Sequence, residues 1–426
     1  MSAPRALDRR ELLAAGAAGL GAAACAAAGE GLAASGVGAP RAVTQPALAR
    51  PAAETGRALV VLEMFGGNDG LSTLVPHQDD AYHRARPTLR FRPEETLRVT
   101  DERGLHPTLE NLHRLYHAGR LAAVEGVGFP APVYSHFRSQ EIWHTARREG
   151  RASGPGWLAR VREGAWGDDP DRMLAVHIGG DMPYSMWSER HPAISFRVAS
   201  DLEWLGTPEQ QLAFRRAAAE ECAELARTER ERMLEELRAR LRDSQIAAAR
   251  LAEITESYRP RSEYPPEPFA AALRSVAALL DSDARTRIYS VVLSNFDTHG
   301  AVQRTKHARL LAQLDRALGA FFADLQGTAA EQRVLVLCWS EFGRRVAENV
   351  SHGTDHGAAG PALLLGAGVR GGLHGQHPSV SDVDGDGNLV HTTDFRRVYA
   401  TCLERWLGVP ATDVLGGRYA PLPILG

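Results

Sequence analysis

IYSVVLSNFDTHG, residues 288–300, opens the part of the sequence that decides the fold. A short run of β-branched and aliphatic residues ends in turn-forming residues, and a helical pattern with leucine and phenylalanine at spacings of three and four follows over 302–325. A second apolar run, VLVLCW, occupies 334–339. A buried strand, an amphipathic helix and another buried strand in this order are typical of a parallel sheet. The segment therefore predicts a strand-helix-strand unit of an α/β fold.

The same alternation extends outward along the chain in both directions. Four further apolar runs are ALVVLEM (58–64), LAAVEGV (121–127), MLAVHI (173–178) and ALLLG (362–366). Amphipathic helical patterns stand between several of them, for example over 106–120. We therefore expect an α/β domain with a largely parallel central sheet, in which a ligand site lies at the carboxyl ends of the strands.

Residues 209–258 interrupt this alternation. The stretch contains no glycine or proline and is dominated by alanine, glutamate, arginine and leucine, with an apolar stripe at Leu234, Leu237 and Leu241. A heptad pattern does not persist, which disfavours a coiled coil. We interpret the stretch as a long helix or a helical hairpin, belonging to a helical cap inserted at about 200–285.

The N-terminus resembles an export signal. Arg9 and Arg10 precede a stretch of alanine and glycine, a pattern typical of substrates of the twin-arginine (Tat) translocation machinery. We predict that residues 1–56 are a Tat signal peptide with a flexible lead-in and that residues 57–426 form the exported domain, located in the periplasm or outside the cell. No later run of about 18 apolar residues occurs, so we expect no transmembrane helix in the mature chain.

The composition excludes several classes of function. With 49 basic and 52 acidic residues, the formal net charge is -3, so the chain has no excess positive charge to bind a nucleic acid. Lys306 is the only lysine and has no glycine run before it, which excludes a P-loop. The cysteines lack CxxC spacing, which argues against a disulfide framework and a thiolate zinc site.

Acidic and imidazole side chains follow several of the expected strands, in FGGNDG, NFDTHG and SEFGRR, and HGTDHG supplies more of them before the next apolar run. Because the carboxyl ends of parallel strands meet at one edge of a sheet, we expect these side chains to converge. Carboxylates and neutral imidazoles suit a divalent ion such as Zn, Mn, Mg or Ca, and we predict one or two such ions. The candidate metal ligands are Asp69, Asp297, His299, Glu341, His352, Asp355 and His356.

SHFRSQEIWHTA, residues 135–146, supplies a candidate nucleophile. A proline-rich loop ends at Tyr134 and a helix begins near Ser135, so the Ser135 hydroxyl would lie among unpaired backbone N–H groups that favour an anion. An ordinary N-cap serine gives the same pattern, and Ser139, one turn further on, is a second candidate. Arg138 or Arg344 would neutralise the transferred group.

Two further motifs are weaker. DVDGDG, starting at Asp382, resembles the first half of a calcium loop, but Thr393 stands where such a loop has glutamate, so we interpret the segment as an acidic turn. GAGVRGG (366–372) matches GxGxxG, but no helix follows it, which disfavours dinucleotide binding.

Together the motifs resemble an exported bacterial family known as domain of unknown function 1501. The resemblance rests on the twin-arginine leader and on GGNDGLSTLVP, SHFRSQEIWHTA, NFDTHG, SEFGR and GTDHGAAGPALLLGAGVRGGLHGQHPS, and it extends over nearly the whole mature chain. This family is grouped more distantly with the alkaline phosphatase and sulfatase superfamily. The resemblance therefore implies a three-layer α/β/α sandwich that binds metal at the strand ends.

The resemblance also implies roles by position. Asp69 resembles the first metal ligand, Ser135 resembles the nucleophile, and Asp297 with His299 resembles the pair that holds the other ion. The superfamily pair is commonly four residues apart, whereas this pair is two apart.

Two alignments remain open for the Asp-His dipeptide of the superfamily. Asp355-His356 matches it by letter, whereas Glu341-Phe342 matches it by position after a strand, with Phe342 in place of the imidazole. In the second alignment, His352 or His356 becomes the closing ligand.

The leading hypothesis is an exported metal-dependent hydrolase of phosphate or sulfate esters, in which Ser135 attacks a small anionic substrate. The alternative is a non-catalytic exported binding or assembly protein on a degraded alkaline phosphatase-like scaffold. Phe342 and the short Asp297–His299 spacing favour this alternative.

Overall fold

The computed structural model describes residues 56–149, 152–167, 169, 171–197, 229–282 and 284–425. The expected signal segment with Arg9 and Arg10, and the first part of the expected cap insertion, lie outside the described residues. Within the described ranges, no helix combines the length and apolar character needed to cross a membrane.

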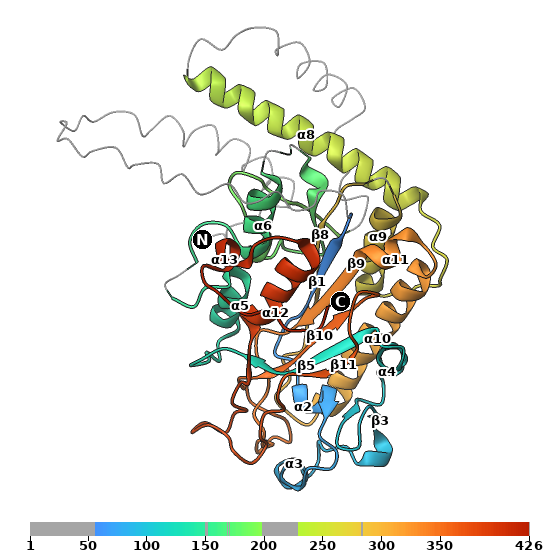
Figure 1. Cartoon of the computed structure of the whole chain (residues 1–426), viewed down its shortest axis with the longest axis vertical. Helices are drawn as coiled ribbons and strands as arrows, with labels where there is room; N and C mark the ends of the chain where they lie inside the picture. Colours follow the sequence, from blue (N-terminus) through green and yellow to red (C-terminus); the bar gives the residue numbers. More distant parts are fainter. Residues whose placement is uncertain are drawn as a thin grey trace, which may run out of the picture. The chain divides into compact units, whose positions relative to one another are not determined.

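A central sheet forms the middle of the described domain (Figure 1). Its nine described strands lie in the spatial order β11-β5-β10-β9-β1-β8-β6-β7, with β12 beside β5. The strands are β1 (Ala58–Met64), β5 (Leu121–Gly128), β6 (Ala175–Ile178), β7 (Ile194–Phe196), β8 (Ile288–Leu293), β9 (Val334–Trp339), β10 (Gly360–Leu365), β11 (Gly372–His374) and β12 (Thr393–Asp394).

Strand β1 lies between β8 and β9 and is parallel to both, with Leu59 beside Ile288 and Leu335. Strands β6, β7, β11 and β12 also pair in parallel, whereas β10 is antiparallel to β5 and to β9. The predicted α/β fold with a largely parallel sheet is therefore confirmed.

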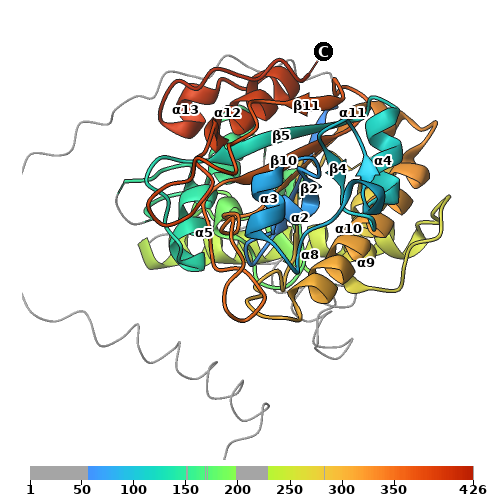
Figure 2. The ribbon, with the colours of Figure 1, turned by 90° about the horizontal axis from the view of Figure 1, so that it is seen from below.

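Helices cover both faces of the sheet (Figure 2). The side chains of β1 alternate between the two cores, as a strand period of two requires. Val60 and Leu62 pack into one core, whereas Leu59 and Val61 pack into the other. The first core is completed by α4 (Glu110–His117), α8 (Glu229–Ser257), α9 (Pro268–Asp281), α10 (Gln303–Leu325) and α11 (Ala329–Arg333). The second is completed by α5 (His136–Thr145), α6 (Trp157–Trp166), α12 (Phe395–Ala400), a π-helix (Thr401–Leu407) and α13 (Ala411–Leu415).

The described part of the expected cap insertion packs into the first core. Helix α8 buries Ala247 and Leu251 there, and α9 contacts α10 and β8. A small peripheral sheet of β2 (Leu74–Val75), β4 (Gly104–Leu105) and β3 (Leu97–Arg98) lies near the short helices α2 (Gly70–Thr73) and α3 (Asp80–Ala85).

Candidate metal centre

The candidate centre lies at the carboxyl edge of the parallel strands, where the sequence predicts a site. Strand β8 leads to Asp297, and β9 leads to Glu341. Strand β5 ends at the same edge and leads through a loop to His136, the first residue of α5. Because β10 runs in the opposite direction, its beginning meets this edge, and His356 lies just before it.

The turn after β1 needs glycine for the loops to approach one another. Gly66 has φ +120°, and a Cβ atom there would lie 2.4 Å from the backbone nitrogen of Asp297. A side chain at this position would therefore separate the loop that follows β1 from the loop that follows β8.

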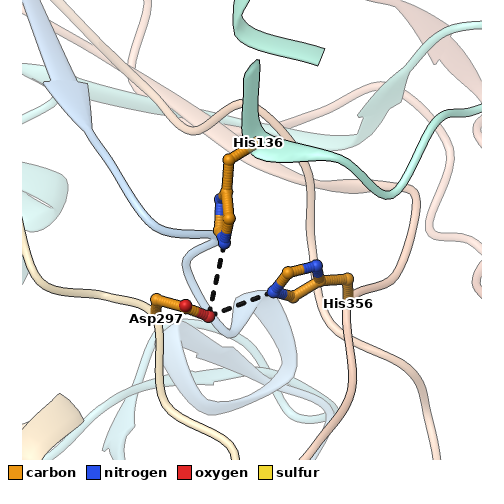
Figure 3. Close-up of side chains that lie close together, drawn as sticks. All are labelled: His136, Asp297 and His356. Atoms are coloured by element: carbon orange, nitrogen blue, oxygen red, sulfur yellow. Dashed lines mark hydrogen bonds and ion pairs between the residues drawn. The ribbon is translucent and has the colours of Figure 1, made fainter. Parts of the chain in front are cut away.

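Asp297 Oδ1 is the common point of the centre (Figure 3). His299 Nε2 lies 2.7 Å from it, His356 Nε2 3.0 Å, Arg344 Nη2 3.1 Å and His136 Nε2 3.4 Å. The ligand atoms of His136, Asp297 and His356 all lie within 4.8 Å of one another. Three imidazoles and one guanidinium therefore surround one carboxylate oxygen, and two of these imidazoles, those of His136 and His356, form with Asp297 a group that could hold a metal ion.

The remaining ring nitrogens of two histidines fix their tautomers. His136 Nδ1 lies 2.7 Å from Glu341 Oε1, and His356 Nδ1 lies 2.8 Å from the Tyr134 carbonyl oxygen. A carboxylate and a carbonyl only accept hydrogen bonds, so each Nδ1 carries the proton in the hydrogen-bond network. In the neutral rings, both Nε2 atoms therefore present lone pairs toward Asp297.

A cation between two lone pairs and a carboxylate oxygen would replace their mutual repulsion by attraction, and these three residues could hold a metal ion. His136 Nε2 is buried and has no hydrogen-bond partner among the described residues. Zinc binds nitrogen and oxygen ligands at about 2.0–2.2 Å, which sets tetrahedral ligand atoms roughly 3.3 Å apart. The Asp297 distances of 3.0 Å to His356 and 3.4 Å to His136 fit that spacing. Two imidazoles with one carboxylate favour Zn or another transition ion over Ca and Mg.

Electrostatics keep Asp297 ionised. Burial by itself raises its pKa, but the neighbouring His356 ring and the Arg344 guanidinium outweigh burial and hold the pKa well below its usual range. The hydrogen bond with Glu341 raises the pKa of His136, whereas burial lowers the pKa of His356. The carboxylate therefore keeps the charge that a divalent ion requires.

Aromatic rings enclose the two histidines that have fixed tautomers. The Phe342 ring centroid lies 4.9 Å from that of His136 and 4.7 Å from that of His356, and the Phe65 ring lies 5.6 Å from His136. Phe342, which replaces an imidazole in one alignment of the resemblance, thus packs between two candidate ligands.

Four of the predicted ligands come together, but with different roles. Asp297, His299 and His356 face the common point. Glu341 is fully buried and contacts His136 at Nδ1, the ring nitrogen that does not face Asp297. The histidine that Glu341 holds was not among the predicted ligands.

Asp69 lies apart from the centre, in a buried polar network. Its Oδ2 accepts hydrogen bonds from Arg86 Nη1 at 2.7 Å, Ser72 Oγ at 2.8 Å and Gln303 Nε2 at 3.0 Å. Burial raises the pKa of this carboxyl, but the Arg86 guanidinium outweighs burial and holds it well below its usual range. The structure therefore places Asp69 in an internal ion pair with Arg86.

Asp355 and His352 lie in the loop before β10. Asp355 Oδ1 accepts a hydrogen bond from Asn349 Nδ2 at 3.0 Å and lies 3.9 Å from His299 Nδ1. His352 is exposed, with φ +59°, and its backbone N–H donates to the Asn349 carbonyl. Neither side chain faces Asp297 Oδ1.

Ser135 is the N-cap residue of α5, and its hydroxyl makes no capping hydrogen bond. It is exposed and lies between Tyr134 and His136, both of which contact the centre. Ser139, the second candidate, is buried and donates to the Glu341 carbonyl at 2.5 Å. The free hydroxyl is therefore that of Ser135.

The two candidate arginines are already engaged. Arg138 Nη1 lies 2.8 Å from Glu141 Oε2, and its Nη2 donates to the Arg148 carbonyl. Arg344 is buried, and besides Asp297 it donates to the carbonyl oxygens of Gly66, Gly67, Phe296, Thr298 and Thr354. Arg344 thus fastens the loops of the centre together.

The chain was compared with solved structures. It is similar to a protein of the alkaline phosphatase superfamily from Vibrio parahaemolyticus, with 12% identity, 87% of this chain and 71% of that chain covered, and a TM-score of 0.39. It is also similar to the C-terminal periplasmic domain of EcEptC from Escherichia coli. The identity is 10%, the match covers 85% of this chain and 86% of that chain, and the TM-score is 0.40. A third similar structure is the phosphonate monoester hydrolase SpPMH from Silicibacter pomeroyi. The identity is 10%, the match covers 85% of this chain and 76% of that chain, and the TM-score is 0.39.

No curated protein matches the sequence. A family model described as protein of unknown function (DUF1501) matches residues 121–412, the range that holds His136, Asp297, Glu341 and His356. The match covers more than half of the chain, and the chain belongs to this family.

Proposed function

We propose that this protein is a metal-dependent hydrolase of phosphate or sulfate esters that binds one divalent ion between His136, Asp297 and His356. The observation that carries the proposal is the pair of Nε2 lone pairs, held by Glu341 and by the Tyr134 carbonyl, that face Asp297 Oδ1. The proposal includes export by the Tat machinery, directed by residues 1–56, to the periplasm or outside the cell. Residues 57–426 would then form the catalytic domain.

A divalent ion at this place would act as a Lewis acid on a non-bridging oxygen of the ester. The Ser135 oxygen, at the N-terminus of α5, would form a bond to phosphorus or sulfur while the bond to the leaving oxygen breaks. The hydroxyl proton passes to the leaving oxygen, which departs as the alcohol. Water then attacks the same atom, restoring the Ser135 hydroxyl and releasing phosphate or sulfate.

An activity panel tests the proposal. The mature chain is stripped with a chelator, reloaded with Zn, Mn, Mg or Ca, and assayed with para-nitrophenyl phosphate and sulfate. We expect turnover that requires the ion. Ser135→Ala is expected to lower kcat on the order of a hundredfold or more while the ion stays bound, because only the nucleophile is removed.

The ion count needs its own control. His113 Nε2 and His117 Nε2 lie 3.0 Å apart on α4, away from the centre, and such a pair offers a surface site for transition ions. The ion is therefore counted in a background that carries His113→Ala and His117→Ala. Stoichiometric ion without turnover of either ester would contradict the hydrolase.

One observation favours the alternative of a non-catalytic binding or assembly protein. Among the described residues, Arg344 is the arginine that contacts the centre, and its N–H groups donate to Asp297 and to loop carbonyls. They are therefore already used and do not neutralise a transferred phosphate or sulfate group. Such a protein would bind the ion and turn over neither ester, so the same panel separates the two functions.

A further inference from the structure

Glu341, expected from the sequence to bind metal, is turned away from the centre. Its side chain is fully buried, and Oε1 accepts from His136 Nδ1 at 2.7 Å and from the Gly66 N–H at 2.9 Å. Its Oε2 accepts from Ser340 Oγ at 3.1 Å. Two N–H groups and the Ser340 hydroxyl, which also lies 2.8 Å from the Met64 carbonyl oxygen, therefore surround a carboxyl group that does not reach Asp297 Oδ1.

We propose that Glu341 is a positioning residue that builds the ion site without touching the ion. It holds His136 as the Nδ1–H tautomer, so that Nε2 presents its lone pair, and it fixes the ring orientation by a short hydrogen bond. The inference rests on the proposed ion site of the hydrolase and assigns one more residue to that site.

The charge of Glu341 adds to this effect. Through the hydrogen bond it increases the basicity of the imidazole, and together with Asp297 it offsets the two positive charges of a divalent ion. Orienting partners of this kind contribute about 10–100-fold to metal affinity. Glu341→Gln separates charge from shape, because the amide oxygen still accepts from His136 and Gly66 and the amide nitrogen faces Ser340.

The chain offers a matched control in a second buried Glu–His pair. Glu63 Oε2 lies 2.9 Å from His144 Nε2, and Glu63 Oε1 accepts from Gln140 Nε2 at 2.7 Å. His144 belongs to the same helix as His136, and β1, which carries Glu63, pairs with β9. Glu63→Gln removes the same charge at a place that holds no candidate ligand.

The test measures ion affinity in the full mature chain, in the background that lacks His113 and His117. Zn affinity is measured by competition with a chromophoric chelator, and the coordination by the absorption bands of the Co-loaded protein. We expect Glu341→Gln to weaken Zn binding by about 10–100-fold and to shift the Co bands. Glu63→Gln is expected to leave both unchanged.

Equal Zn affinity in wild type and Glu341→Gln would overturn the inference, as would an equal loss in Glu63→Gln. Should Glu341→Gln fail to fold, Glu341→Asp replaces it, because the shorter side chain keeps the charge but withdraws from His136 and must also weaken binding. Ion binding without ester turnover contradicts the hydrolase and leaves this inference standing. Turnover together with unchanged affinity in the Glu341 variants contradicts only this inference, and a wild-type chain that binds no ion overturns both.

Discussion

Helix α5 carries two histidines, each paired with a buried glutamate, and the surroundings of the two pairs differ. His144, in the last turn, pairs with Glu63 inside the core between the sheet and the helix. His136, in the first turn, pairs with Glu341, and its other nitrogen faces Asp297 and, through it, His356. The same two residue types thus give an internal polar contact in one place and a candidate ligand in the other. The two histidines differ in the surroundings of the ring nitrogen that does not contact the glutamate.

The largest expected difference between the two pairs is in ion binding. His136→Asn removes a ligand and is expected to weaken Zn binding by more than the roughly 100-fold that marks the loss of an orienting partner. His144→Asn is expected to leave Zn affinity unchanged, because His144 contacts Glu63 and no candidate ligand. Titration of both variants, with thermal unfolding to confirm that each is folded, checks the contrast. A loss of affinity in the His144 variant would remove the distinction between the pairs.

The Glu63 region is expected to respond to pH through stability. His177, hydrogen-bonded to Ser290, is near Glu63, His144 and Asp181, and burial lowers its pKa from 6.5 to about 4. Below pH 6.5 the unfolded chain binds a proton that the folded chain does not, so the free energy of unfolding falls until pH reaches about 4. The largest loss from this residue is roughly 3 to 4 kcal/mol.

Urea unfolding of wild type and His177→Gln from pH 8 to pH 4 isolates this contribution. The difference between the two free energies of unfolding should be constant above pH 7 and should change as the pH falls to about 4. A difference that is independent of pH would show that His177 does not titrate as its burial requires.

The smallest expected effect concerns the other orienting contact of the centre. The Tyr134 carbonyl holds His356, and the Tyr134 hydroxyl accepts from Asn388 Nδ2 at 2.7 Å. Tyr134→Phe keeps the carbonyl and removes this bond together with the longer one, of 3.4 Å, that the hydroxyl donates to Asp386 Oδ2, a loss of about 1 kcal/mol that weakens Zn binding roughly fivefold. Tyr184→Phe, which removes a hydroxyl bonded to the Gly154 carbonyl, is the control. An effect as large as that of Glu341→Gln would mean that the two orienting contacts are equivalent.

Much of the fold follows from local sequence. The apolar runs at 58–64, 288–294 and 334–339 coincide with β1, β8 and β9, because buried strands of a parallel sheet are apolar on both faces. The run at 362–366 is also a strand, but its antiparallel direction was not predictable, because an apolar run carries no direction. That direction brings His356 to the centre.

Asp297 was predicted because it directly follows a strand, and His356 because it stands in the HGTDHG motif before another apolar run. His136 follows a long loop, and its role depends on Glu341, which is remote in sequence, so no local spacing marks it. The one signal was its place beside Ser135 in the SHFRSQEIWHTA motif. Asp69 also follows a strand, but it forms a buried ion pair with Arg86, and no sequence pattern predicts that contact.

The acidic turn that starts at Asp382 also supports the centre. Asp384 Oδ1 accepts from the N–H groups of Asp386 and Asn388, which shapes the turn as its sequence predicts. Asn388 then reaches Tyr134, so the turn supports the loop that holds His356.

Arg344 ties the backbone of the β1, β8 and β9 loops together through its hydrogen bonds to their carbonyls. The loops that carry Asp297 and His356 are consequently held in place by hydrogen bonds within the polypeptide itself. Under the proposed function, exchange of one ion for another would then proceed without refolding. Ligand side chains can also be replaced in the course of evolution while the scaffold persists, which lets one architecture pass from one chemistry to the next.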